Sequence, residues 1–275
     1  MHRTHNAFEA IFALVILMAS ACGQNRLSVS EQPSSPSVQI AKEITSPRID
    51  SFAQDSTGHI WIGTFRGLNR HNAHEIIQYY STGDETSLPN NEVFRLHTDR
   101  SGRLWVSTTA GIAYYTDKDD FHRPKNWDRT QVYQIAESPD GRVFFNDRSR
   151  IFEYLPENDS LTCVIRYKDS QSGSIRLMHF LGEEKIAIVW PDSVSLYDAG
   201  TYSYISSIPM KDPVSISAEG PSGKIWLGTR KGPVLLNPED NSLDSIPEAV
   251  LSEGNLSSDP FSILQYDSSL HGRND

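Results

Sequence analysis

The chain has 275 residues, enough for one large domain or two small ones, and 37% of them are hydrophobic. With 17 glycines, 15 prolines and an aromatic content of 10%, the composition favours a β-rich protein with many turns over a helical bundle or a disordered chain. The formal net charge of −10 argues against a nucleic-acid partner, because phosphate binding needs a basic stripe that the sequence lacks. A neutral or cationic ligand is the simpler expectation.

The first residues are typical of an export signal. An apolar run over residues 10–18 follows a weakly basic start, and it is too short to span the roughly 30 Å hydrocarbon layer of a membrane. The stretch Ala19-Ser20-Ala21-Cys22 resembles the lipobox of bacterial lipoproteins, in which the cysteine becomes the lipidated first residue. We therefore predict a signal peptide over residues 1–21, a lipid anchor at Cys22 and an exported, periplasmic, membrane-anchored protein. Ordinary cleavage after Ala21 would leave an exported protein without the lipid.

A flexible tether is predicted to follow the anchor. Residues 22–45 are rich in Ser, Pro and Gln and poor in apolar residues. Further on, Cys163 lies in an apolar segment with strand-like alternation, so we expect a small buried side chain rather than a catalytic thiol. Since the chain has only two cysteines, no internal disulfide framework is expected.

The rest of the chain is built from repeats. Five copies of a turn and its following strand recur at intervals of 39 to 44 residues, counted at Trp61, Trp105, Phe144, Ala187 and Trp226. The patterning within each copy is that of a strand, without the apolar residues three and four apart that a helical repeat would show. A period of about 40 to 50 residues with strand patterning predicts propeller blades of four strands.

The turn of each copy has a recurring composition. Asp55 and Asp99 stand at its first position, where a carboxylate accepts backbone hydrogen bonds. Glycine at the fourth position tolerates a positive φ. These glycines are Gly58, Gly102, Gly141 and Gly223. The aromatic residue three positions later is predicted to pack between blades, because an apolar residue fills the same place in every copy.

We therefore predict an all-β propeller of about five four-stranded blades and the start of a sixth. The approximate blades within residues 46–275 are 46–89, 90–128, 129–172, 173–212 and 213–255, and the sixth begins within 256–275. Residues 261–266 have the pattern of a first strand. Either the ring is incomplete and the chain is part of a longer protein, which is the interpretation we favour, or it closes as a small ring with this strand as the clasp.

Two segments carry a motif that resembles a known family. They are Asp55-x-x-Gly58-x-Ile60-Trp61-Ile62-Gly63-Thr64-x-x-Gly67-Leu68 and Gly223-x-Ile225-Trp226-Leu227-Gly228-Thr229-x-x-Gly232, and both are similar to the two-component regulator propeller repeat. The resemblance extends from about residue 46 to the end and implies the periplasmic sensor region of a Bacteroidetes hybrid two-component system. In that family the propeller recognises oligosaccharides, and an immunoglobulin-like domain, a membrane helix and a histidine kinase follow it.

The chain departs from the family pattern at two turns and in length. Asp147 and Arg150 stand in the third copy where threonine and glycine are expected, and Trp190 and Ser193 do so in the fourth. These substitutions predict turns that are built differently. The sensors of the family typically carry many more repeats, and this sequence shows neither a transmembrane run nor a kinase histidine box.

No catalytic, metal or cofactor site is predicted. His71 and His74 lack the further ligands that zinc needs. Two acidic pairs, Asp119-Asp120 and Glu183-Glu184, are adjacent rather than opposed, so we interpret them as solvated turn residues and not as a glycosidase pair. His179 lies in a strand pattern and is interpreted as a packed histidine.

The predicted activity is binding. The candidate ligand contacts are Arg66, Arg70, Tyr114, Arg148 and Arg230. The leading interpretation is an extracytoplasmic sensing module of a two-component system that recognises oligosaccharides, with further propeller repeats or a sensor kinase as partners. The alternatives are a propeller-fold glycosidase or lyase, and a scaffold lipoprotein that binds other proteins. No nucleic-acid partner is expected, and the membrane is contacted only through the lipid anchor.

Overall fold

The computed structural model describes residues 38–245, except 73, 117, 128, 168–174, 176, 221 and 222. The described residues form 21 strands in five antiparallel sheets. None of them belongs to a helix of the length and hydropathy that crossing a membrane requires. The predicted signal peptide, the anchor at Cys22 and the start of a sixth blade lie outside the described residues.

The five sheets follow the order of the chain. The first contains β1 (Val38–Ala41), β2 (Ile49–Gln54), β3 (Ile60–Thr64), β4 (Gly67–His71) and β5 (Ile76–Tyr79). The second contains β6 (Val93–Thr98), β7 (Leu104–Thr108), β8 (Gly111–Tyr115) and β9 (Phe121–His122), and the third contains β10 (Gln134–Glu137), β11 (Val143–Asn146), β12 (Arg150–Leu155) and β13 (Ser160–Arg166). The fourth contains β14 (Leu177–Leu181), β15 (Lys185–Val189), β16 (Ser193–Asp198) and β17 (Tyr204–Pro209), and the fifth contains β18 (Val214–Glu219), β19 (Ile225–Thr229), β20 (Gly232–Asn237) and β21 (Ser242–Ser245).

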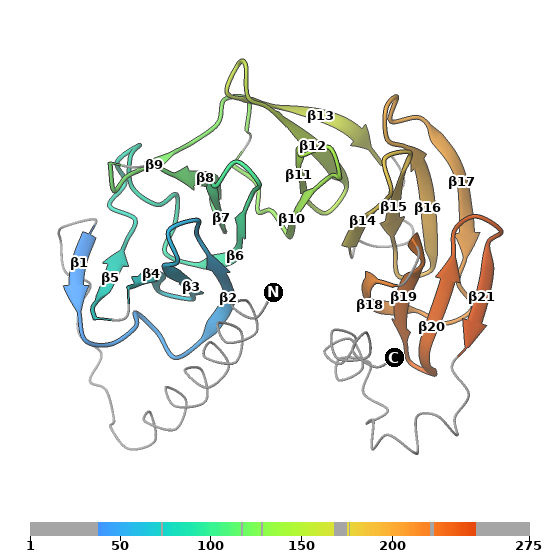
Figure 1. The fold of residues 1–275 in the computed structure, drawn as a ribbon, viewed down its shortest axis with the longest axis horizontal. Helices are drawn as coiled ribbons and strands as arrows, with labels where there is room; N and C mark the ends of the chain where they lie inside the picture. The colour runs from blue at the N-terminus through green and yellow to red at the C-terminus, as the bar shows by residue number, and fades with distance from the viewer. Residues whose placement is uncertain are drawn as a thin grey trace, which may run out of the picture.

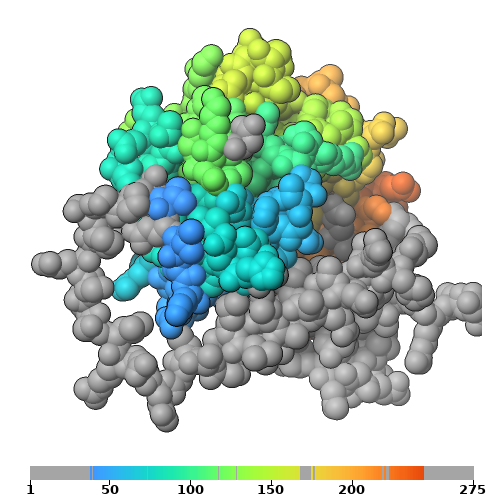
Figure 2. Space-filling view, turned by 60° about the vertical axis from the view of Figure 1, so that its left-hand side comes forward, coloured from blue at the N-terminus to red at the C-terminus, as the bar shows by residue number. Residues whose placement is uncertain are grey.

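The sheets stand along an arc, with β2, β6, β10, β14 and β18 toward its centre (Figure 1). The innermost strands β2, β6, β10, β14 and β18 contact one another in succession, so each sheet packs on its neighbours in the chain. Figure 2 shows the blue and cyan atoms of the first sheet lying directly against the green atoms of the second. This arrangement confirms the predicted all-β propeller of four-stranded blades.

The first sheet has one strand more than the others. β1 pairs antiparallel with β5 on the outer edge of the sheet, through partners such as Val38 with Tyr79. These residues lie within the range predicted as a tether, and their alternation is too short to separate a strand from a linker in sequence. The ordered sheet therefore begins before residue 46.

In each of the first four sheets, the strand beside the innermost one carries a residue that packs against the next sheet. Trp61 packs with Leu104 and Val106 of the second sheet, and Trp105 packs with Val143 and Phe145 of the third. Phe144 and Ala187 hold the same place in the third and fourth sheets. We call these residues, with Trp226 of the fifth sheet, the wedge positions. Trp61 and Trp105 are 0% exposed, whereas Trp226 is half-buried.

The turn before the second strand is tied to the wedge residue. Asp55 accepts a hydrogen bond from Trp61 Nε1 at 2.8 Å, and Asp99 accepts one from Trp105 Nε1 at the same distance. The other carboxylate oxygen accepts a backbone N–H across the turn, and Gly58 and the equivalent glycines have positive φ values. Where the wedge is phenylalanine, which has no N–H, the third copy has Ser138 instead of aspartate. The repeat motif is therefore one hydrogen-bonded unit.

The second turn of each sheet is closed by a side chain at its start. Thr64 Oγ1 donates to the carbonyl of Gly67, and Thr108 and Thr229 make the same bond in their sheets. In the third sheet Asp147 replaces threonine, and its Oδ1 accepts the N–H groups of Ser149 and Arg150. The different build predicted for this turn is confirmed.

Tyrosines and carboxylates join neighbouring sheets at their outer strands. Asp119 of the second sheet accepts a hydrogen bond from Tyr79 of the first at 2.9 Å. Asp159 of the third sheet accepts one from Tyr114 of the second at 3.1 Å. Both aspartates have positive φ, which places their carboxylates toward the preceding sheet. Asp119 is thus a link between sheets, not only the solvated turn residue that the sequence indicated.

Small residues after the wedge allow the sheets to approach. A Cβ added to Gly63 would lie 2.8 Å from Ser51 Oγ and 2.8 Å from Val93 Cγ1, closer than such atoms can come. We therefore expect Gly63→Ala to lower the free energy of unfolding by about 1–3 kcal/mol in urea titrations. Gly200→Ala, whose nearest neighbour is at 3.5 Å in an exposed turn, is the matched control and is expected to change it little. Equal effects of the two substitutions would contradict the close approach.

The pairing of turn residue and wedge predicts a coupling energy. Asp99→Ala leaves the buried Trp105 N–H without its acceptor and is expected to cost about 1–3 kcal/mol. The double variant Asp99→Ser, Trp105→Phe reproduces the pair found in the third sheet. Its cost should be clearly smaller than the sum of the two single substitutions in a double-mutant cycle. Strict additivity would show that the two side chains do not act as a unit.

Candidate functional site

The two ends of the sheets carry different turns and loops. Neighbouring strands of each sheet run in opposite directions. The turn that follows β3, β7, β11, β15 or β19, which we call the second turn of its sheet, therefore lies at the same end as the connections between sheets. We call this the connection end. The opposite end carries the Asp-x-x-Gly turns and the outer hairpins with Asp119 and Asp159, which serve to hold the sheets together.

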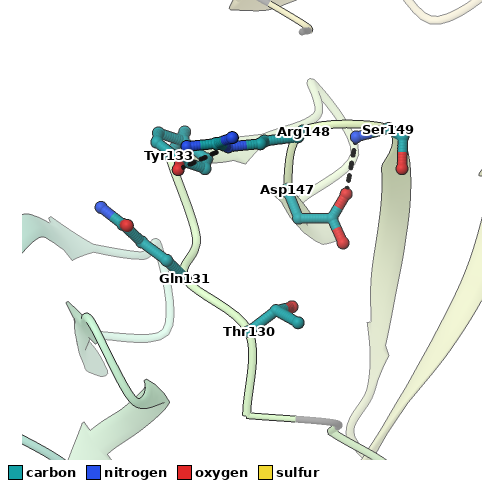
Figure 3. A pocket seen from close by; sticks show the side chains of 6 residues that line it. All are labelled: Thr130, Gln131, Tyr133, Asp147, Arg148 and Ser149. Carbon is teal, nitrogen blue, oxygen red and sulfur yellow. Dashed lines mark hydrogen bonds between the residues drawn. The ribbon is translucent and has the colours of Figure 1, made fainter. Parts of the chain in front are cut away.

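A pocket of about 320 Å³ opens at the connection end of the third sheet. Its lining comes from the segment before β10 and from the turn between β11 and β12, and consists of Thr130, Gln131, Tyr133, Asp147, Arg148 and Ser149. Figure 3 shows the Arg148 side chain lying against Tyr133 at the rim, with Asp147 beside them. All six lining residues carry polar groups and one has an aromatic ring, but most of the surface that they expose to the pocket is apolar.

Tyr133 is the centre of a small arginine cluster. Arg148 Nε donates to the Tyr133 hydroxyl at 3.0 Å, and the guanidinium lies 5.8 Å from the ring centroid. Arg95 of the neighbouring sheet donates from Nε to the Tyr133 carbonyl at 3.0 Å and from Nη1 to the Phe94 carbonyl at 2.8 Å. The hydrogen bond to Tyr133 raises the pKa of the fully exposed Arg148 above its ordinary value. Both side chains are thus held in place while remaining exposed.

The one carboxylate in the pocket lining is already neutralised. Asp147 is buried, its Oδ2 lies 2.6 Å from both Nε and Nη2 of Arg150, and its Oδ1 accepts two backbone N–H groups. A glycosidase of the usual kind needs a pair of carboxylates across the scissile bond, and the pocket lining contains only this paired one. Among the described residues, no group of three or more His, Cys, Asp or Glu could hold a metal ion.

The structure separates the five residues predicted as ligand contacts. Arg66, Arg148 and Arg230 are exposed on the second turns of the first, third and fifth sheets, and so all lie at the connection end. Arg70 and Tyr114 lie toward the opposite end and are used within the fold. Arg70 pairs with Asp119 at 3.0 Å beneath three aromatic rings, and Tyr114 donates to Asp159.

Sequence reasoning missed Tyr133 and Arg95. A signal was present in the repeats, since Val132-Tyr133-Gln134 corresponds to Val93-Phe94-Arg95 one copy earlier. In the second sheet the pairing of β6 with β7 shifts between Val93 and Arg95, so Phe94 is a bulge residue. Bulges turn a side chain out of the regular alternation and are frequent beside binding sites. Comparing the copies at this position would have indicated both residues.

Comparisons with known proteins agree with the fold. Residues 43–66 and 87–110 match the family model described as the two component regulator propeller. The resemblance is therefore confirmed for the segment that begins at Asp55, and the copy around Trp105 matches the same model. No relative of the chain is found among curated proteins.

Solved structures give the same architecture. The extracellular domain of a putative hybrid two-component system from B. thetaiotaomicron has a TM-score of 0.59 and 21% identity over 71% of this chain and 29% of that one. A catalytically inactive virginiamycin B lyase from Staphylococcus aureus has a TM-score of 0.53 and 13% identity over 76% and 75% of the two chains. A gluconolactonase from Xanthomonas campestris has a TM-score of 0.50 and 9% identity over 71% and 74%. At these identities the likeness shows the fold alone, and the chain spans less than a third of the sensor domain.

His179 is buried beside the central strands, as predicted, and bridges two sheets. Its Nε2 lies 2.8 Å from Ser217 Oγ, and burial lowers the pKa of His179 to about 4. The folded state therefore keeps this imidazole neutral at a pH where the unfolded chain, with an ordinary histidine pKa of about 6.5, binds a proton. Its contribution to stability is complete above about pH 6.5 and is lost as the pH falls toward 4.

This titration predicts acid sensitivity that a single substitution removes. Between about pH 7 and pH 5, the neutral burial of His179 should cost about 2 kcal/mol of unfolding free energy. His179→Gln cannot take up the proton, so the same pH change should destabilise this variant by about 2 kcal/mol less than the wild type. Parallel pH profiles of the two proteins in urea unfolding would contradict the assignment.

Proposed function

We propose that this protein is an extracytoplasmic ligand-sensing propeller module of a two-component signalling system, and that the pocket at Tyr133 and Arg148 binds an oligosaccharide. The observation that carries the proposal is the match of two repeats to the two component regulator propeller model, together with a pocket lined by residues with polar groups on the connection end of the same array. The structural likeness to a sensor's extracellular domain supports the fold that this role needs.

The pocket suits a ligand with many hydroxyl groups. Thr130, Gln131 and Ser149 offer hydroxyl and amide groups that donate and accept hydrogen bonds, and the half-buried Tyr133 ring offers an apolar surface against which a sugar ring can stack. The cluster needs no cofactor for this. Binding without turnover is the role that these groups support, since none of them is poised as an acid and base pair.

Export, a lipid anchor at Cys22 and signalling partners complete the proposal. The sequence Ala19-Ser20-Ala21-Cys22 supports cleavage and lipidation, which would hold the propeller at the membrane surface on the periplasmic side. Partners would be further propeller repeats and a sensor kinase, because such a module has to pass on the bound state. We also propose that the chain is part of a longer sensor, because its repeats match the two component regulator propeller model.

Calorimetry against a panel of oligosaccharides tests the function. We expect one sugar class to bind the purified chain with measurable heat and without turnover, and Arg148→Ala to weaken that binding by about tenfold, since charged hydrogen bonds contribute about 1.5–3 kcal/mol. Lys118→Ala removes a positive charge from an exposed turn at the opposite end and should leave the affinity unchanged.

Three outcomes separate the competing functions. Binding heat without turnover, at an affinity that Arg148→Ala lowers about tenfold and Lys118→Ala leaves unchanged, supports sensing at this pocket. Product formation from a panel member would overturn the proposal in favour of a propeller-fold glycosidase or lyase. A well-folded chain that binds no oligosaccharide would instead fit the scaffold lipoprotein.

A further inference from the structure

We infer that the oligosaccharide bound at this pocket is anionic, and that its carboxylate or sulfate groups are received by Arg95 and Arg148 on the two sides of Tyr133. The inference rests on the proposed function and names the chemical class of the ligand. It is carried by the hydrogen bonds of the two guanidinium groups, by the absence of a described carboxylate that pairs with either, and by the distribution of charge between the two ends of the sheets.

Each arginine is anchored through only part of its guanidinium group. Arg148 uses Nε to donate to the Tyr133 hydroxyl, and Arg95 uses Nε and Nη1 to donate to the carbonyls of Tyr133 and Phe94. Both terminal nitrogens of Arg148 and Nη2 of Arg95 make no hydrogen bond with the described residues. A guanidinium group fixed in this way presents N–H donors in the forked geometry that suits carboxylate and sulfate oxygens.

The tyrosine hydroxyl adds a third donor. Since the Tyr133 oxygen accepts the hydrogen bond from Arg148, its own proton is available to an acceptor on a ligand. Arg148 thus lies beside the phenol hydroxyl, while Arg95 of the neighbouring sheet is held on the main-chain carbonyl of the same residue, and all three groups can donate to an anion. A neutral sugar could use the hydroxyl and the ring but would gain less from the paired charges.

No carboxylate among the described residues neutralises this cluster. Neither Arg95 nor Arg148 forms an ion pair with any described Asp or Glu, and both are exposed. The nearby Asp147 is committed to Arg150 at 2.6 Å. The pocket lining therefore carries the unpaired positive charge of Arg148, and Arg95 adds a second one beside it through the backbone of Tyr133, in a protein whose formal net charge is −10.

Further positively charged side chains lie at the connection end, outside the pocket. Arg66 and Arg230 are exposed on the equivalent turns of other sheets, and their guanidinium groups likewise have no carboxylate partner in the described part of the chain. At the opposite end Arg103 and Arg142 lie over aromatic rings, and the exposed Arg100 pairs with Glu137 at 3.8 Å. That end also carries most of the turn carboxylates, namely Asp55, Asp99, Asp119, Asp140, Asp159 and Asp240.

This separation of charge means that the net charge of the whole chain does not describe the end that we propose as the ligand site. A net charge of −10 favoured a neutral or cationic ligand, but it sums over both ends of the molecule. A ligand that enters the connection end meets unpaired guanidinium groups, and a local field of one sign concentrates ligands of the other sign there. The acidic excess lies on the side that holds the sheets together.

The test compares ligands that differ only in charge. Calorimetry of the full purified chain would use a uronic-acid oligosaccharide, the same oligosaccharide after reduction of its carboxyl groups, and a sulfated oligosaccharide. We expect at least one acidic ligand to bind about tenfold or more tightly than the neutral one. Raising the salt from about 50 to about 500 mM should weaken the acidic ligand several-fold and leave the neutral one nearly unaffected.

Variants then locate the charge. Arg148→Ala and Arg95→Ala should each remove most of the preference for the acidic ligand, while Arg148→Lys should keep part of it because the charge remains but the fork is lost. Lys118→Ala is the matched control for charge. Unchanged folding of each variant is checked by its urea midpoint, so that a loss of binding is not confused with unfolding.

The outcomes distinguish the ligand class from the function itself. If the neutral and acidic ligands bind equally and salt has no effect, the anionic class is wrong while oligosaccharide sensing stands. If none of the ligands binds, both proposals fall. If the acidic ligand binds but only Lys118→Ala reduces its affinity, the site lies at the opposite end and the assignment to Arg95 and Arg148 is overturned.

Discussion

The contact between the wedge residue of one sheet and the apolar second strand of the next is the interaction on which the rest of the structure depends. A single four-stranded sheet of this chain has apolar residues on both faces of its second strand, as in Ile60, Trp61 and Ile62, and it cannot cover them alone. Radial stacking covers both faces at once, and burial of an aromatic wedge contributes several kcal/mol per interface. Trp61 and Trp105 are fully buried in such contacts, whereas Trp226 of the fifth sheet is half-buried.

Because of this constraint, the contacts at one end of the sheets recur from repeat to repeat, whereas the side chains at the other end differ between repeats. The Asp-x-x-Gly turn must hold the wedge, and the outer tyrosines must reach the next carboxylate, so the opposite end repeats the same contacts from sheet to sheet. The second turns and the connections between sheets do not hold the wedge residue or the outer tyrosines in place. They differ between sheets, from Arg66 to Asp147-Arg148-Ser149, and a rigid array therefore presents diverse side chains at one end.

The sequence predicted the parts of this account that recur. The strand-turn-strand unit, its glycines, the all-β class and the core position of the tryptophans follow from periodicity, because each copy obeys the same local physics. The altered turn at Asp147 was predicted for the same reason. The strand β1 was not, because four residues on an outer edge leave no periodic signal.

The site could be predicted only in part. Arg148, Arg70 and Tyr114 were all selected as side chains that loops could offer at one end of the sheets, but Arg70 and Tyr114 proved to be used between sheets. Their partners lie 40 or more residues away in the chain, as Tyr114 and Asp159 do, and no local pattern shows such a pairing. The separation of charge between the two ends also could not be predicted from the sequence. Successive turns of the chain lie at opposite ends, and the net charge adds the charges of both ends together.

The central claim is that the ligand binds at the connection end, against side chains that the radial packing leaves unused. Hydrogen–deuterium exchange of the full chain with and without an acidic oligosaccharide tests it most directly, since it maps the contact without any substitution. The account predicts slower exchange confined to segments around Phe94, Tyr133 and Arg148, with the Asp-x-x-Gly turns unchanged. Protection centred on the turns at Asp55 and Asp99, with the segment around Tyr133 unaltered, would contradict it.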